Sequence, residues 1–149
     1  MKKKIPWILP GFIILILDRV LKAACSDVNE TLIPGVIALR SARNTGMALG
    51  LFQGGVWVIL AVSVLLIIAA YFLLRDMRLA GWAPLGISLM AGGALGNMID
   101  RIAYGYVIDM FEFLFVDFYI FNVADVGVVA GAAICGASLL FRPRDWSKK

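Results

Sequence analysis

The sequence has no histidine, few charged residues and only two cysteines, and each shortage excludes a class of protein. Without histidine there is no Ser-His-Asp or Cys-His catalytic arrangement, and the commonest metal ligand is missing. Cys25 and Cys135 lie far apart in apolar segments, so they form neither a disulfide framework nor a CxxC metal motif. Charged residues make up 16% of the chain, against about 25% in soluble domains. This excludes an ordinary cytosolic enzyme, a disordered chain and a nucleic-acid-binding module.

What the sequence does contain is long apolar runs. Hydrophobic residues make up 62% of its 149 residues, and the mean hydropathy is +0.91. A helix that crosses a membrane needs about 20 mainly apolar residues. Segments of this kind occur at 5–24, 56–74, 82–101 and 123–141. The sequence therefore predicts an all-α membrane protein in which residues 1–149 form one domain with four transmembrane helices.

The two longer connections, 25–55 and 102–122, do not resemble free linkers. The first holds short β-prone stretches on either side of Pro34-Gly35, which predicts a small β-containing region. The second is aromatic throughout and carries Asp109, Glu112 and Asp117, so a fifth span is disfavoured. Aromatic rings favour the membrane–water interface, and we expect this segment to lie there.

Lysine and arginine indicate the orientation of the chain, because short cytoplasmic loops are enriched in both. One side of the predicted bundle holds Lys2, Lys3, Lys4, Arg75, Arg78, Arg142, Arg144, Lys148 and Lys149. The other side holds Arg40 and Arg43, together with the carboxylates of the second connection. Both termini should therefore be cytoplasmic, and both long connections should face outward. The run that follows the N-terminal lysines is too long for a signal-peptide core and is interpreted as a retained first span.

Ionisable groups in or beside membrane spans are rare and costly, so each is a candidate for function. Asp18 and Lys22 stand four residues apart on one helix face, in the favourable order for an ion pair. The pair orients the first helix or also shapes a polar site. Asn97 and Arg101 follow Gly93 at the same spacing, which indicates either a hydrated helix end or a stripe that holds a substrate.

Two acidic residues point to a chemistry. Asn122 suits a helix N-cap and Asp125 follows three residues later, as in a capping box. Asp109 lies in the preceding connection, which can bring it to Asp125. Two carboxylates in one poorly hydrated site do not both ionise readily, so one holds a proton while the other acts as a base. This arrangement suits hydrolysis of a peptide bond by direct attack of water.

Other functions remain open on the residues alone. Ser26 follows Lys22 by four residues, as a Ser/Lys dyad requires, although Asp18 already pairs with that lysine. A carboxylate metal site needs a tighter cluster of acids than the sequence offers. A small proton- or cation-coupled transporter uses buried acids too, but more naturally at mid-span. A non-catalytic assembly subunit has no need for two acids to meet.

Five motifs, in order along the chain, resemble those of the lipoprotein signal peptidases (signal peptidase II), the membrane aspartyl peptidases of bacteria. They are Asp18-x-x-x-Lys22, Asn44-Thr-Gly-Met-Ala48, Gly93-Ala-Leu-Gly-Asn-Met-Ile-Asp-Arg101, Tyr106-Val-Ile-Asp109-Met-Phe and Phe121-Asn-Val-Ala-Asp125. Each motif is weak alone, whereas all five in order are highly specific. The sequence departs from the family pattern at Met47 and Leu49.

The resemblance implies an endopeptidase of the bacterial inner membrane, with its active site near the outer face. It implies that Asp109 and Asp125 are catalytic, and that Asp18 and Lys22 are structural. Asn44, Gly46, Asn97, Arg101 and Asn122 are then expected to shape the site or to contact the substrate. The expected substrate is a diacylglyceryl-modified prolipoprotein, cleaved before its lipidated cysteine. We expect contact with membrane lipid, a monomer, and no metal, cofactor or nucleic acid.

Overall fold

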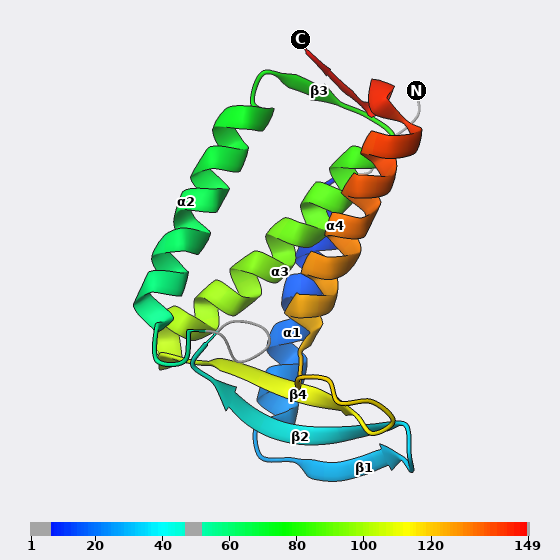
Figure 1. The fold of residues 1–149 in the computed structure, drawn as a ribbon. Coiled ribbons are helices and arrows are strands. Elements are labelled where there is room, and N and C mark those ends of the chain that lie inside the picture. Colours follow the sequence, from blue (N-terminus) through cyan, green and yellow to red (C-terminus); the bar gives the residue numbers. More distant parts are fainter. Residues whose placement is uncertain (1–6, 47–51, 149) are drawn as a thin grey trace.

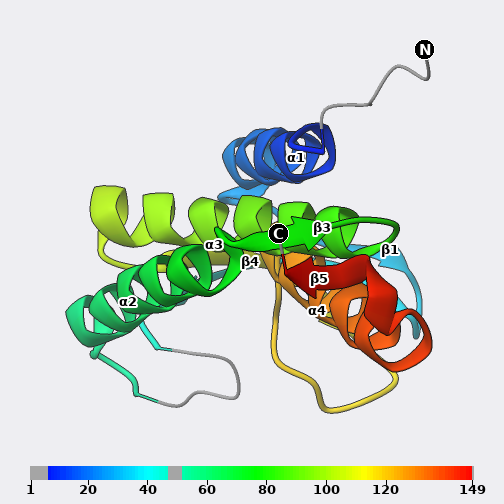
Figure 2. The ribbon, with the colours of Figure 1, turned by 90° about the horizontal axis from the view of Figure 1, so that it is seen from above.

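The computed structural model describes residues 7–46 and 52–148, whose architecture is set by four helices. They are α1 (Leu9–Cys25), α2 (Val56–Leu74), α3 (Ala83–Tyr104) and α4 (Val123–Phe141). Helix α3 lies between α1 and α4, whereas α2 stands to one side of this group (Figures 1 and 2). The predictions on Lys2, Lys3, Lys4, Met47, Leu49 and Lys149 lie outside the described residues.

The helix bounds agree with the prediction for α2 and α4 and differ for the other two. Helix α1 begins at Leu9, later than predicted, because Pro10 sits in the first turn, where its missing N–H is not needed. Helix α3 continues to Tyr104 and stops where Gly105 adopts a left-handed φ of 74°.

Two of the described helices, α2 and α4, are long and apolar enough to cross a membrane by length and composition. Helix α1 has 17 residues and carries Asp18, Arg19 and Lys22. Helix α3 has 22 residues and carries the charged residues Asp100 and Arg101 near its C-terminal end. Length and hydropathy therefore agree with two of the four predicted spans, those at α2 and α4.

Glycines allow α1, α3 and α4 to approach closely. A Cβ atom added at Gly92 of α3 would collide with the backbone of Gly11 in α1. One added at Gly93 would collide with the carbonyl oxygen of Ala124 in α4. The two neighbouring glycines thus face different helices, which seats α3 between α1 and α4.

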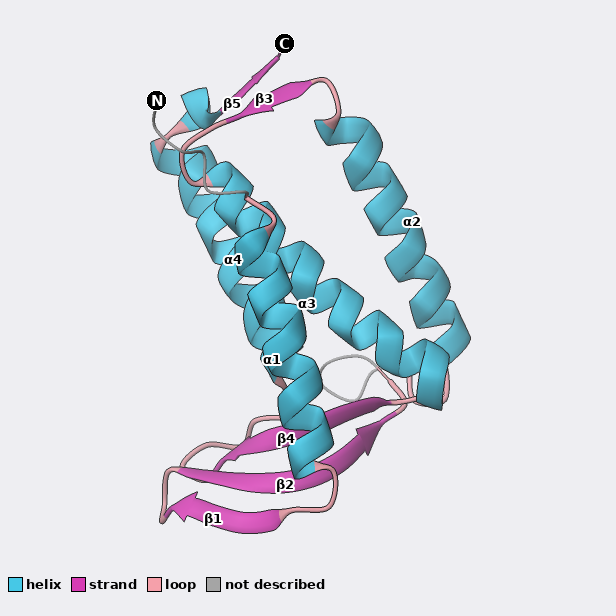
Figure 3. Cartoon of the chain, turned by 180° about the vertical axis from the view of Figure 1, so that it is seen from behind, coloured by secondary structure: helices cyan, strands magenta, loops and turns pink. Residues whose placement is uncertain are grey.

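A three-stranded antiparallel sheet closes one end of the bundle (Figures 1 and 3). Its order is β1-β2-β4, with β1 at Asn29–Ile33, β2 at Ile37–Asn44 and β4 at Val107–Phe113. The turn between β1 and β2 contains Gly35 with φ of 72°, so the predicted β region is confirmed. Strand β4 was not predicted, since we expected this aromatic segment simply to lie at the membrane interface.

A second, two-stranded sheet lies at the opposite end of the bundle (Figure 1). Strand β3 (Met77–Leu79) pairs with β5 (Trp146–Lys148), next to the short 3-10 helix η2 (Pro143–Asp145). The buried Asp145 links the start of α3 to the end of α4. Its carboxylate accepts a hydrogen bond from Trp82 N at 3.1 Å and one from Ser138 Oγ at 3.2 Å. The start of α1 and strand β5 thus lie at one end, and the three-stranded sheet lies at the other.

Candidate active site

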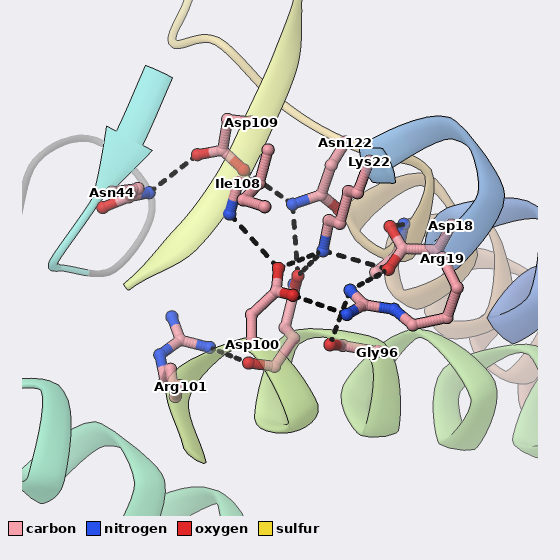
Figure 4. A network of polar contacts seen from close by, with 12 residues as sticks. Asp18, Arg19, Lys22, Asn44, Gly96, Asp100, Arg101, Ile108, Asp109 and Asn122 are labelled. Atoms are coloured by element: carbon pink, nitrogen blue, oxygen red, sulfur yellow. Dashed lines mark hydrogen bonds and ion pairs between the residues drawn. The ribbon is translucent and has the colours of Figure 1, made fainter. Parts of the chain in front are cut away.

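A buried polar cluster lies where α1, α3 and α4 meet the three-stranded sheet (Figure 4). Five side chains form its centre, and each is at most 2% exposed: Asp18, Lys22, Asp100, Asp109 and Asn122. Polar groups buried this deeply need partners, and hydrogen bonds and ion pairs connect them here. The structure thus collects residues that the sequence spreads over more than 100 positions.

Asn122 links the two acids named from the sequence. It has an extended backbone, its Oδ1 accepts from Asp125 N at 2.9 Å, and Asp125 Oδ2 accepts from Asn122 N at 3.2 Å. The predicted capping box at the start of α4 is therefore confirmed. The Asn122 Nδ2 then donates to Asp109 Oδ1 at 2.6 Å. One side chain consequently contacts both Asp109 and the residue that carries the second acid.

Asn97 supports Asp125 from α3. Its Nδ2 donates to Asp125 Oδ1 at 2.7 Å. Its Oδ1 accepts from Asn122 Nδ2 at 3.1 Å and from Lys22 Nζ at 3.1 Å. An amide presents two donors and one acceptor oxygen, so these bonds fix which way Asn97 points.

The predicted residues Asn44, Gly46 and Arg101 form a chain of contacts that ends on Asp109. Arg101 Nη2 donates to the carbonyl of Gly46 at 3.1 Å, and Gly46 N donates to Asn44 Oδ1 at 2.9 Å. Asn44 Nδ2 donates to Asp109 Oδ2 at 3.0 Å. A buried guanidinium on α3 thereby holds the turn after β2 against the acid.

Strand β4 aims Asp109 at the start of α4. The residue pairs with Ala42 of β2, next to a register shift between Leu39 and Ala42. Irregularities of this kind redirect side chains and are common beside active sites. Phe111 pairs with Phe121, just before α4 begins. This bridge holds the N-terminus of α4 beside β4, and so places Asp125 beside Asp109.

Electrostatics in the cluster favour a protonated acid. Burial raises the pKa of Asp109 to about 6, and the neighbouring charge of Asp125 acts in the same direction. Hydrogen bonds from Asn44 and Asn122 oppose the rise without cancelling it. Burial also raises the pKa of the Tyr119 hydroxyl, and both acids add to this effect. Near neutral pH the pair can therefore hold one proton between two carboxylates.

A second group of charges lies beside these residues (Figure 4). Lys22 Nζ lies 3.0 Å from Asp18 Oδ2, as the sequence predicted, and 2.7 Å from Asp100 Oδ2. Arg19 pairs with the same two acids, at 2.8 Å to Asp18 and 2.6 Å to Asp100. Asp18 Oδ1 also accepts from Ala124 N at 3.0 Å, which ties α1 to the start of α4.

Arg19 and Asp100 are members of this charge network that the sequence reasoning did not name. The available signal was the spacing of Gly92, Gly96 and Asp100, which puts Asp100 on the face of α3 that packs closely. A Cβ atom added at Gly96 would lie 2.8 Å from Asp18 Oδ2, so this face does meet α1. A carboxylate on such a face needs a cation from the neighbouring helix.

Two alternatives find no support in the geometry. Lys22 is engaged by Asp18, Asp100 and Asn97, whereas the Ser26 hydroxyl donates to Asp27 at 3.3 Å. The Ser/Lys pair is therefore not assembled. Within the described residues no group of three or more Cys, Asp or Glu side chains could hold a metal ion.

The fold is that of a bacterial membrane enzyme. Two solved structures, each described as a bacterial membrane enzyme, resemble this chain at 31% sequence identity. One has a TM-score of 0.81 and covers 90% of this chain and 87% of its own. The other has a TM-score of 0.78 and covers 91% of this chain and 93% of its own. At this identity the likeness concerns the sequence as well as the fold.

The family follows from sequence comparison. Residues 11–141 match the family described as signal peptidase (SPase) II. The lipoprotein signal peptidase of Lactiplantibacillus plantarum is 37% identical, over 79% of this chain and 83% of the relative. That of Streptococcus pyogenes serotype M6 is 36% identical, over 90% of this chain and 91% of the relative. The chain therefore belongs to the signal peptidase II family, and it is a peptidase of the aspartic type. This membership does not favour the transporter that the sequence left open.

Proposed function

We propose that this chain removes the signal peptide from diacylglyceryl-modified prolipoproteins and cuts before the lipidated cysteine, with Asp109 and Asp125 as its catalytic pair. One observation carries the assignment of the pair. Asn122 contacts Asp109 through its side chain and caps the helix turn that holds Asp125. Relatives along most of the chain are named lipoprotein signal peptidases, which supports the choice of substrate.

The pair can hydrolyse a peptide bond without a nucleophilic side chain. One ionised carboxylate takes a proton from water, and the water oxygen bonds to the carbonyl carbon. The protonated partner gives its proton to the carbonyl oxygen, which yields a tetrahedral intermediate. The C–N bond then breaks as the amine takes a proton, and the two acids exchange roles. Each acid therefore needs to be ionised at one stage and protonated at another.

Asp109 is suited to be the acid that is protonated when the reaction begins. Its raised pKa means that it holds a proton at a higher pH than an ordinary carboxyl does. Asn44 and Asn122 donate to its two oxygens and fix the plane of the group. Asp125 then acts first as the base, with Asn97 and the backbone of Asn122 holding its oxygens. Orientation of this kind keeps the water and the scissile carbonyl between the acids.

The same proposal includes a membrane arrangement. All four helices cross the bacterial inner membrane in a single domain, and the protein acts as a monomer in contact with lipid. Arg75, Arg78, Arg142 and Arg144 flank the end that carries β3 and β5, which supports a cytoplasmic location for that end and both termini. The acids then lie near the outer face, where water reaches them and a lipid-anchored substrate enters sideways. The chemistry requires neither a metal nor an organic cofactor.

The test uses the purified full chain in detergent with a synthetic diacylglyceryl precursor, and mass spectrometry of the cleaved ends. We expect cleavage before the lipidated cysteine, and loss of cleavage in both Asp109→Asn and Asp125→Asn. Asp117→Asn is the matched control, because this exposed acid lies in the same connection as Asp109. It should cleave as the parent does.

Two results would contradict the proposal. Normal turnover by either Asn variant of the pair would remove that acid from the chemistry. Equal cleavage of lipidated and unmodified precursor would leave a peptidase with a different substrate. Thermal unfolding of each variant in the same detergent shows whether lost activity reflects lost chemistry or lost fold.

A further inference from the structure

A second polar cavity lies beside α1, on the face of the sheet that points away from Asp109. Its volume is about 430 Å³, within the usual range of ligand sites, about 300–1,000 Å³. Its polar lining includes Arg19, Lys22, Asp27, Ser41, Arg43 and Tyr106. Successive side chains of a strand point to opposite faces of the sheet. Ile108 lines this cavity, whereas Asp109 points toward Asn122 at the start of α4. The cavity therefore lies on the other side of β4 from Asp109, and it shares Arg19 and Lys22 with the buried charge network described above.

One of the three basic side chains that line this cavity has no ionic partner among the described residues. Arg19 and Lys22 are neutralised by Asp18 and Asp100. Arg43 lies over the ring of Tyr106, with 5.2 Å from its Cζ to the ring centroid. It makes no ion pair with any carboxylate in residues 7–46 or 52–148.

Asp27 supplies the opposite charge at the same cavity. Among the described residues, its carboxylate accepts one hydrogen bond, from the Ser26 hydroxyl at 3.3 Å. The cavity thus offers one cation and one anion, both exposed and without an ionic partner among the described residues. A ligand with a negative and a positive group matches this pair of charges.

Arg19 adds an unused donor. Its Nε is buried and has no hydrogen-bond partner among the described residues, although its Nη atoms are paired. Buried donors are nearly always satisfied by protein, water or a bound group. Since Arg19 lines the cavity, an acceptor held beside Arg43 could meet this donor as well.

An apolar track leads along α1 to the cavity. Ile16, Val20 and Ala23 follow one another at helical spacing and are exposed, and Ala23 lines the cavity. Tyr104 is 54% exposed and lines the cavity as well. Aromatic and basic side chains above an apolar helix face are typical of the headgroup layer of a membrane.

We propose that this cavity binds the headgroup of a zwitterionic aminophospholipid. The phosphodiester lies against Arg43 and the free Nε–H of Arg19, the ammonium group lies against Asp27, and an acyl chain follows α1. The inference rests on the membrane arrangement given under the proposed function. It does not depend on the roles of Asp109 and Asp125.

The test titrates the delipidated full chain in detergent with phosphatidylethanolamine and measures binding by native mass spectrometry. Arg43→Gln should weaken binding about tenfold, because a charge-assisted contact to phosphate is lost. Arg40→Gln is the matched control. Arg40 lies on the same strand, pairs with Glu112 at 3.2 Å and does not line the cavity, so this variant should bind as the parent does.

Asp27 is tested by lipid choice. Phosphatidylglycerol keeps the phosphodiester and lacks the ammonium group, so the parent should bind it more weakly than phosphatidylethanolamine. Asp27→Asn should remove this preference. A parent that binds both lipids equally would overturn the assignment of Asp27.

Two further outcomes would overturn the proposal. Equal weakening by Arg43→Gln and Arg40→Gln would show diffuse attraction to positive charge. Glycerophosphoethanolamine that binds as tightly as the intact lipid would show a site for small solutes. Cleavage of the precursor by Arg43→Gln should match the parent, so failure of the lipid site and failure of the peptidase assignment are distinguishable.

Discussion

Asn122 Nδ2 lies 2.6 Å from Asp109 Oδ1, so the residue that caps α4 also positions the acid on β4. The helix cap and the contact with Asp109 use different atoms of Asn122, because Oδ1 accepts from Asp125 N while Nδ2 donates to Asp109. One amide therefore serves both the stability of the helix start and the geometry of the acids. Substitutions can separate these two roles.

Asn122→Ala should lose both roles, and Asn122→Ser should lose only one. Loss of an N-cap costs about 1 kcal/mol, and serine caps as well as asparagine does. Asn122→Ala should therefore unfold more easily than the parent, while Asn122→Ser should keep most of the stability. Both should cleave the precursor about a hundredfold more slowly, since a hydrogen-bond donor to the acid is missing. Thermal unfolding and initial rates measure the two effects. A fully active Asn122→Ser would show that the hydrogen bond from Asn122 Nδ2 to Asp109 is not needed for cleavage.

The rate of cleavage should fall as the pH rises through about 6. The pKa of Asp109 lies near 6 in the free protein, and the proposed mechanism starts with this acid protonated. Above that pH the protonated fraction falls tenfold per unit, so kcat/KM should fall with it. Bound substrate displaces water and raises the pKa further, which moves the decline of kcat to higher pH. Initial rates from pH 5 to 8 measure both, with the unfolding temperature followed over the same range as control. A constant kcat/KM would contradict this role of Asp109.

Asp100→Asn should destabilise the protein strongly. The carboxylate is fully buried and pairs with Arg19 and Lys22, so its neutralisation leaves these two cations to share the single carboxylate of Asp18. Breaking such a pair costs about 3–5 kcal/mol. Asp76→Asn is the control, because the Asp76 side chain is 80% exposed and its ion pair with Arg75 contributes little. Chemical unfolding in detergent compares the two, and equal stability would show that the buried network is not structural.

Gly92→Ala should destabilise the protein, whereas Gly136→Ala should not. A Cβ atom at Gly92 collides with the backbone of Gly11, which forces α1 and α3 apart. A Cβ atom at Gly136 meets nothing within 4 Å, and alanine favours the helix over glycine by about 1 kcal/mol. Unfolding temperatures should fall for the first variant and stay level or rise for the second. A loss of stability in both would indicate that helix contacts other than α1–α3 decide the effect.

The sequence predicted those features that depend on neighbouring residues. Helix α2 is an unbroken apolar run and α4 begins with a capping box, so both were located with their observed bounds. The turn at Gly35 was visible for the same reason. Strand β4 was not, because its partner β2 lies more than 60 residues away and nothing local specifies the pairing. Its aromatic content also fits a segment that lies on a membrane.

The residues of the candidate site also fall into those that the sequence predicted and those that it did not. The two acids, Asn97 and Asn122 could be named from spacing and motif, and the structure brings them together. The pairing of Arg19 with Asp100 depends on how closely α1 and α3 approach, which is decided by Gly11 and Gly92 on different helices. Contacts of this kind depend on tertiary packing, so a single motif does not reveal them.

Side chains alternate between the two faces of β4, and this limits how the number of residues between α3 and Asp109 can vary. One residue inserted or deleted next to Gly105 would turn Asp109 to the opposite face of the sheet and bring an apolar side chain, that of Ile108 or Met110, toward Asp125. Such a protein would retain both acids and every amide around them, yet by the proposed mechanism it would be inactive. The length of this short link is therefore under as strict a constraint as the identity of the carboxylates themselves.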